Sequence, residues 1–176
     1  KQKKLEPFLK KIIFSNYKNF QPNTEIEFNY PLTVLVGRNG TNKSSVLKAL
    51  HACIHGTSLA DFWFETDLDP IHAASYWYTY DYVLPNSDKV EAQVYLTKRK
   101  REGNIDYWET SAPSTAIGMQ PYPDTKDPKF SSLPNKTRWM KINPDQKSST
   151  YLSFRESLSC FDQFYYYGTY KWIFTK

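Results

Sequence analysis

The chain has 176 residues, of which 40% are hydrophobic and 17% are aromatic. This length fits one domain or part of a larger one, and so many large side chains exclude disorder throughout the chain. The formal net charge is +5, which permits a phosphate-rich partner without requiring one. No window approaches the roughly 20 apolar residues of a membrane span. We therefore expect a cytoplasmic protein without membrane contact.

The first third of the chain has the pattern of an α/β fold. Residues 9–14 form an apolar run, and residues 24–30 alternate between apolar and polar, which predicts two strands joined by a polar turn. Residues 32–36 are apolar without alternation, as in a central strand that is covered on both faces. The next apolar residues recur at helical spacing up to Gly56, a residue that commonly ends helices. This spacing predicts a helix over residues 44–56.

The rest of the chain has the pattern of antiparallel strands. Residues 73–84 are dense in tyrosine, and residues 90–97 alternate between apolar and polar. The run at 98–104 is typical of a hairpin tip, and residues 105–110 are typical of the returning strand. The proline-rich stretch at 111–136 predicts a long loop or a disordered insertion.

Three further elements are expected in the last forty or so residues. The apolar residues of 137–142 favour a strand, those of 151–161 a short helix, and those of 163–167 a final aromatic-rich strand.

One motif of the sequence is typical of phosphate-binding loops. The segment from Gly37 to Ser44 nearly fits the phosphate-binding pattern G-x-x-x-x-G-K-[ST], and it lies between the predicted buried strand and the predicted helix. In such a site the loop amides and the helix N-terminus cradle phosphate, Lys43 reaches the β and γ oxygens, and the Ser44 hydroxyl binds Mg²⁺. Ser45 can add a contact to the α-phosphate. The residues that we expect to bind ATP here are Gly37, Asn39, Gly40, Thr41, Asn42, Lys43, Ser44 and Ser45.

The loop departs from the pattern at Asn42, where glycine is usual because the backbone there tends to adopt a positive φ. Asparagine enters the left-handed region more readily than other non-glycine residues, at a modest cost in strain. We therefore expect ATP binding that is weaker than with glycine. A loop that joins strand and helix without any ligand is the alternative.

Residues 11–20, residues 25–28 and the loop, with its G-x-N-G-x-x-K-S-S core, resemble the N-terminal lobe of SMC/RecF-type ABC ATPases. The resemblance implies an α/β P-loop lobe with an antiparallel β-subdomain, and self-association of two nucleotide-bound heads. It also places Lys18 and Asn19 in a turn that approaches the phosphates or ribose. The chain then divides into a nucleotide-binding lobe with a β-meander at 1–110, the loop at 111–136, and a continuation of the lobe at 137–176.

Within this family, the aromatic stretch at 161–168 and the loose loop resemble bacterial antiphage ATPases of the Septu, retron-associated and OLD groups. That narrower resemblance implies that the nucleotide state is coupled to an effector nuclease of the HNH type.

The sequence contains no Walker B run ending in Asp-Glu, no L-S-G-G-like signature and no switch histidine. The resemblance places these parts in a C-terminal lobe, so it implies ATP hydrolysis only with that lobe and a second head. It also implies a metal-contacting glutamine, for which Gln163 is the first candidate. Gln93, Gln120 and Gln146 remain alternatives.

Other residues allow a second class of function, a P-loop scaffold without hydrolysis or a nucleic-acid-binding module. The basic run Lys98, Arg99, Lys100 and Arg101 can contact a nucleic-acid backbone, although a solvated hairpin tip is the plainer interpretation. Aromatic side chains can stack on bases, although alternating aromatics more often pack a sheet. The aromatic candidates are Tyr76, Trp77, Tyr78 and Tyr80. His51 and His55 share a helix face, but no third metal ligand is evident.

Overall fold

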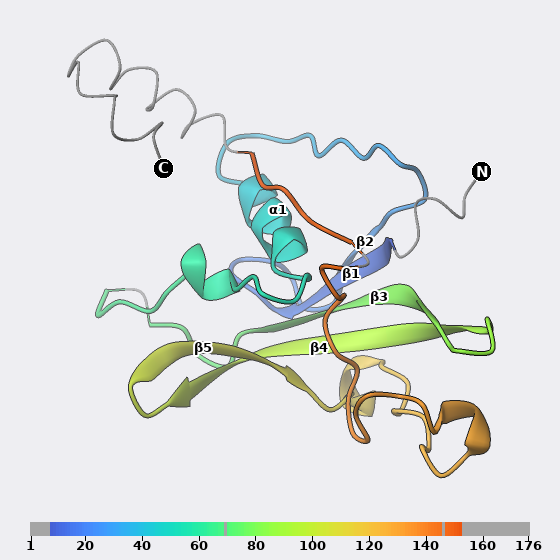
Figure 1. Ribbon diagram of the computed structural model, residues 1–176. Coiled ribbons are helices and arrows are strands. Elements are labelled where there is room, and N and C mark those ends of the chain that lie inside the picture. The colour runs from blue at the N-terminus through green and yellow to red at the C-terminus, as the bar shows by residue number, and fades with distance from the viewer. Residues whose placement is uncertain (1–7, 69, 146, 153–176) are drawn as a thin grey trace, which may run out of the picture.

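The computed structural model describes residues 8–68, 70–145 and 147–152. Its centre is a five-stranded antiparallel sheet in the order β2-β1-β3-β4-β5, with the helix α1 (Lys43–His51) packed on one face (Figure 1). The strands are β1 (Leu9–Asn16), β2 (Thr24–Glu27), β3 (Ser75–Val83), β4 (Lys89–Arg101) and β5 (Asn104–Ser111). No helix among the described residues is long and apolar enough to cross a membrane.

Alternation along β3 divides its side chains between the two faces of the sheet. Tyr76 and Tyr78 belong to the main core under α1, where both are fully buried. Trp77 lies on the opposite face, in a smaller cluster with Ile13 and Met119. The aromatic strand predicted over residues 73–84 is therefore present, and it is covered on both sides.

The helix begins where the sequence predicts, but it ends at His51 rather than near Gly56. The chain after it runs beside a segment far along the sequence. Ile54 forms a parallel bridge with Ile142, and the His55 amide donates a hydrogen bond to the Ile142 carbonyl oxygen at 2.9 Å. We call residues 137–145 the strap. The strand predicted over 137–142 is wrong, since only this isolated bridge is formed.

The central strand predicted over residues 32–36 is not formed in the described structure. Leu32, Val34 and Val36 are 79%, 71% and 89% exposed. An apolar run of this kind needs neighbouring strands on both sides to become a buried strand. The described residues supply none, because the sheet already ends at β2 and β5.

Residues 111–136 form a loop that packs against the sheet. It contains two short 3₁₀ helices, Thr115–Ile117 and Pro128–Phe130, and it buries the side chains of Met119 and Leu133. The helix predicted over 151–161 lies almost wholly outside the described residues, and the strand predicted over 163–167 lies entirely outside them.

Candidate phosphate-binding site

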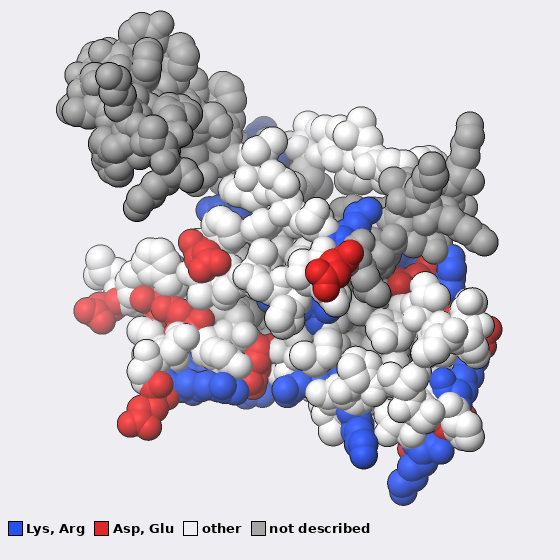
Figure 2. Space-filling view, in the orientation of Figure 1, with Lys and Arg blue, Asp and Glu red and all other residues white. Residues whose placement is uncertain are grey.

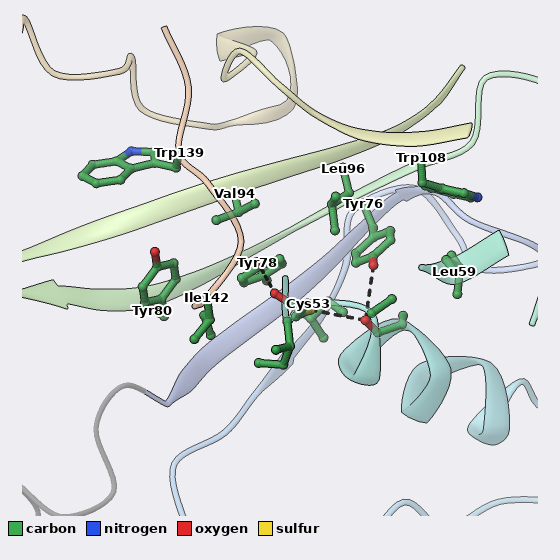
Figure 3. Packing of buried hydrophobic residues seen from close by; sticks show 14 of the residues in the cluster. Cys53, Leu59, Tyr76, Tyr78, Tyr80, Val94, Leu96, Trp108, Trp139 and Ile142 are labelled. Atoms are coloured by element: carbon green, nitrogen blue, oxygen red, sulfur yellow. Dashed lines mark hydrogen bonds between the residues drawn. The ribbon is translucent and has the colours of Figure 1, made fainter. Parts of the chain in front are cut away.

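The sheet positions α1 through tyrosine hydroxyls as well as through apolar contact. Three buried tyrosines donate hydrogen bonds to carbonyl oxygens spaced four residues apart, two in α1 and one just after its end, and Figure 3 shows two of these bonds. The bonds join Tyr17 to Ser45, Tyr76 to Ala49 and Tyr78 to Cys53, at 2.9, 3.2 and 2.7 Å. They fix both the rotation and the height of the helix above the sheet, and so they place the loop that precedes it.

The backbone of that loop has the conformation that the motif requires. Asn42 has φ 60° and ψ 17°, in the left-handed region, and Gly40 has φ 81°. The expectation of a positive φ at Asn42 is therefore met. Gly37 allows a close approach, because a Cβ there would lie 2.9 Å from the Thr41 hydroxyl oxygen. That hydroxyl in turn donates to the Arg38 carbonyl oxygen at 2.8 Å and closes the loop.

Lys43 reaches back over the loop. Its Nζ donates to the carbonyl oxygens of Gly37 and Arg38, at 2.7 and 2.6 Å. The ammonium group is thus held against the loop by the loop's own backbone. An anion that enters here meets a positive charge and the unpaired amides of the first helical turn, which is the arrangement that binds phosphate.

The two serines that follow Lys43 differ in their surroundings. Ser44 is exposed, and its hydroxyl has no hydrogen-bond partner among the described residues, so it is accessible to a metal ion. Ser45 is only 7% exposed, because it packs towards Tyr17. Asn39 and Thr41 are exposed on the loop.

The turn after β1 lies against the start of α1. The bond from Tyr17 to the Ser45 carbonyl oxygen joins the two, and it brings the neighbouring Lys18 and Asn19 to the same end of the helix. Lys18 adopts φ 49°, and its ammonium lies 5.2 Å from the centre of the Trp63 ring. Nothing in the sequence pattern singled out Trp63.

The basic run at 98–101 is largely paired with carboxylates. Lys98 has a side chain only 2% exposed, and its Nζ lies 2.6 Å from Glu65 and 3.4 Å from Asp106. Lys100 contacts the other oxygen of Glu65 at 2.6 Å. Arg99 and Arg101 both pair with Glu109. In Figure 2, acidic side chains accordingly lie beside basic ones at the lower left, where the β4–β5 hairpin lies.

This pairing changes the interpretation of the hairpin. The strand β4 continues to Arg101, so the tip is shorter than the predicted 98–104, and Lys98 belongs to the sheet rather than to a solvated turn. The two hydrogen bonds from Lys100 and Lys98 lower the pKa of Glu65 to about 2.

Two other sequence candidates do not form sites in the described structure. Tyr76, Trp77, Tyr78 and Tyr80 are each at most 5% exposed, so they pack the core and offer no face for stacking on bases. His51 contacts the Ser149 hydroxyl at 2.9 Å. The described residues contain no group of three or more side chains that could hold a metal ion. Gln163 lies outside the described residues.

Residues 11–160 match the AAA domain family. The chain is also similar to two proteins named chromosome partition protein Smc, from Lactiplantibacillus plantarum and from Halothermothrix orenii. It is 30% identical to each, over 114 and 110 residues, which is 56% of this chain and 9% of either relative. No solved structure matches the chain.

The chain belongs to the AAA domain family, and it combines an ATPase domain of this type with an antiparallel five-stranded sheet. Within that class, its first third resembles the N-terminal region of SMC-type ABC ATPases, and the similarity to the two Smc proteins supports this resemblance. The chain spans about a tenth of the length of the Smc relatives that it matches.

Proposed function

We propose that this chain is the ATP-binding part of an SMC/RecF-like ABC ATPase, with ATP and Mg²⁺ bound at the loop from Gly37 to Ser44. The observation that carries the proposal is the position of Lys43, whose ammonium is held over the loop at the N-terminus of α1. The exposed Ser44 hydroxyl is the protein ligand for Mg²⁺. Lys18 and Asn19 approach the nucleotide from the adjoining turn.

Hydrolysis by this site needs more than the described residues, because phosphoryl transfer depends on charges placed around the γ-phosphate. We attribute those charges to a C-terminal lobe and to a second head. Two features support a covering lobe. Residues 32–36 expose apolar side chains, and an apolar cavity of about 470 Å³ beside α1 is lined by Phe8, Leu47 and Ile54, among others.

The finer part of the proposal is a role in antiphage defence, in which the nucleotide state controls an effector nuclease of the HNH type. It rests on the resemblance of residues 161–168 to the Septu, retron-associated and OLD groups. Co-purification of an HNH nuclease with the protein, dependent on ATP, is the expected result. Purification of the protein without any nuclease partner, in the presence and in the absence of ATP, would contradict it.

The test of the ATP site is the Lys43→Ala variant. Removing the ammonium takes away the charge that meets the β and γ phosphates, so we expect ATP affinity to fall at least about a hundredfold, in line with the loss of a charge-assisted contact. Titration of labelled ATP in the presence of Mg²⁺ measures the change. Lys136→Ala, at an exposed lysine far from the loop in sequence, is the matched control. An unchanged affinity in Lys43→Ala would contradict the proposal.

A second candidate function is a scaffold whose phosphate loop no longer supports turnover, and the side chain at Asn42 is the observation that favours it. The variant Asn42→Gly separates the two functions. A large gain in ATP affinity supports a decayed loop, whereas no gain or a loss means that Asn42 is a working part of the site.

The same class of function includes a nucleic-acid-binding module that uses the basic run at 98–101. Because these charges are paired with carboxylates, we expect little salt-dependent binding of nucleic acid there.

A further inference from the structure

A second cavity lies at the opposite end of α1 from the phosphate loop. Its volume is about 460 Å³, within the usual range of small-molecule sites. It lies between the chain that follows α1, the far half of β3 and the strap. Figure 3 shows Trp139 and Tyr80 beside the strap segment that carries Ile142. We call this cavity the strap pocket.

One wall of the strap pocket is aromatic. The rings of Tyr82 and Tyr122 both contact Trp139, with centroids 5.5 and 5.1 Å away. Trp139 is buried, while the two tyrosines are half-buried and line the cavity. The Tyr122 hydroxyl donates to the Asn135 carbonyl oxygen at 2.9 Å, which holds its ring in place. A ring-bearing ligand therefore meets aromatic side chains that are already held in place.

The other wall of the strap pocket is basic. His55, Arg138 and Lys141 line the cavity, and no Asp or Glu does so. The Nε of Arg138 is buried, and among the described residues it has no hydrogen-bond partner and its guanidinium has no ion pair with a carboxylate. Arginine and lysine side chains elsewhere on the sheet, such as Lys98 and Arg101, do have carboxylate partners. A buried donor without an acceptor is rare, and a bound anion would supply the acceptor.

Lys141 is the second cation of this wall. Its Nζ donates to the Thr57 carbonyl oxygen at 2.7 Å, a contact that fixes the amine without neutralising it. Burial lowers the pKa of Lys141. Cys53 and Asp61 act on Lys141 electrostatically, but neither forms an ion pair with it among the described residues. The charge of the amine is therefore left for a ligand to balance.

We propose that the strap pocket binds a ring-bearing monophosphate of the size of one nucleotide, with its ring against Tyr82 and Tyr122 and its phosphate at Arg138 and Lys141. Aromatic surfaces interleaved with cations recognise nucleotides in this way. An acidic peptide would use the cations but not the stacking wall. The ligand is either a free nucleotide or the end of a single strand, and both present the same chemistry.

The experiment titrates thymidine 5′-monophosphate into the full chain carrying Lys43→Ala, so that the phosphate loop does not contribute. The indole resonance of Trp139 in an NMR spectrum reports binding beside Tyr82 and Tyr122. Thymidine and inorganic phosphate are the two half-ligands. We expect the monophosphate to bind at least tenfold more tightly than either. A short oligothymidylate that binds more tightly still identifies the end of a strand as the source, and equal affinity identifies the free nucleotide.

The variant Arg138→Gln is expected to weaken binding of the monophosphate at least tenfold while leaving thymidine binding unchanged. Lys136→Gln, an exposed charge two residues away, is the matched control and should have no effect. If circular dichroism shows that Arg138→Gln is unfolded, Tyr122→Leu serves as the second variant. In that variant we expect the loss of affinity to come from the ring contact instead of the phosphate contact. Equal affinity for thymidine and its monophosphate, or no shift of the Trp139 resonance, would overturn the proposal. ATP binding by Arg138→Gln at a wild-type phosphate loop should be unaffected, so the two sites can fail separately.

Discussion

At the scale of single residues, Glu65 links two lysines of β4 through one carboxylate. It receives Lys98 on one oxygen and Lys100 on the other, both at 2.6 Å. The Glu65 amide donates to Asp106 at 2.7 Å, so this one residue ties the loop before β3 to the β4–β5 hairpin. Because the Lys98 side chain is buried, its charge depends on this carboxylate.

We expect Glu65→Gln to lower the melting temperature more than Glu109→Gln does, since Glu109 pairs with arginines that are 58% exposed. The difference should depend on pH. The folded state holds the pKa of Glu65 at about 2, below its usual value near 4.5. The folded state therefore binds fewer protons than the unfolded state between these values, and the contribution of Glu65 is full above about pH 4.5 and is lost towards pH 2.

Thermal unfolding of both variants at pH 7 and at pH 3 measures the effect. Equal melting temperatures for the two variants at pH 7 would contradict the role given to Glu65.

The contact between Glu65 and Lys98 also shows how far the sequence alone can be interpreted: the sequence pattern identified the basic run at 98–101 but not its partner. Glu65 lies 33 residues before Lys98, and only the folded sheet brings them together.

At the scale of elements, the packing of α1 on β3 includes hydrogen bonds from phenol groups. Burial raises the pKa of Tyr76 and of Tyr78 well above the ordinary value. Both hydroxyls stay protonated and continue to donate to the Ala49 and Cys53 carbonyl oxygens. The alternation of residues 73–84 predicted the strand, and the apolar spacing predicted the helix. No local pattern predicted that the two would be joined through hydroxyl groups.

The variant Tyr78→Phe removes the donor to the Cys53 carbonyl oxygen and keeps the ring. We expect the free energy of unfolding to fall by about 0.5–1.5 kcal/mol, the usual net value of a buried hydrogen bond. Tyr95→Phe is the matched control, because its half-buried hydroxyl makes no hydrogen bond among the described residues. Urea unfolding measures both. A larger loss in Tyr95→Phe than in Tyr78→Phe would contradict this account.

At the scale of the whole molecule, the sheet and its helix leave one apolar surface open. The exposed side chains of residues 32–36 lie close in sequence to Tyr30, which is 78% exposed. Sequence reasoning predicted a buried strand here, since an apolar run without alternation is typical of one. It could not supply the neighbouring strands. The same reasoning did predict all five strands of the described sheet, β1 to β5, because their partners lie within the described chain.

Exposure at this surface leads to a prediction for the chain as it is described. Because Val36 is 89% exposed, Val36→Thr should change the free energy of unfolding by less than about 0.5 kcal/mol, as surface substitutions usually do. Val94→Thr, at a fully buried position of β4, should cost more than about 1 kcal/mol. Denaturant unfolding of this 176-residue chain compares the two. A large loss in Val36→Thr would mean that residues 32–36 are covered.

The three tyrosine bonds to α1 have a mechanical consequence. Their acceptors are four residues apart, two in α1 and one at Cys53 just after it, so they hold the helix against the sheet at three successive turns of the chain. Rotating the helix about its axis would break all three together. We therefore expect α1 and the sheet to move as one rigid body. A small displacement of the phosphate loop would then also displace the far ends of β3 and β4.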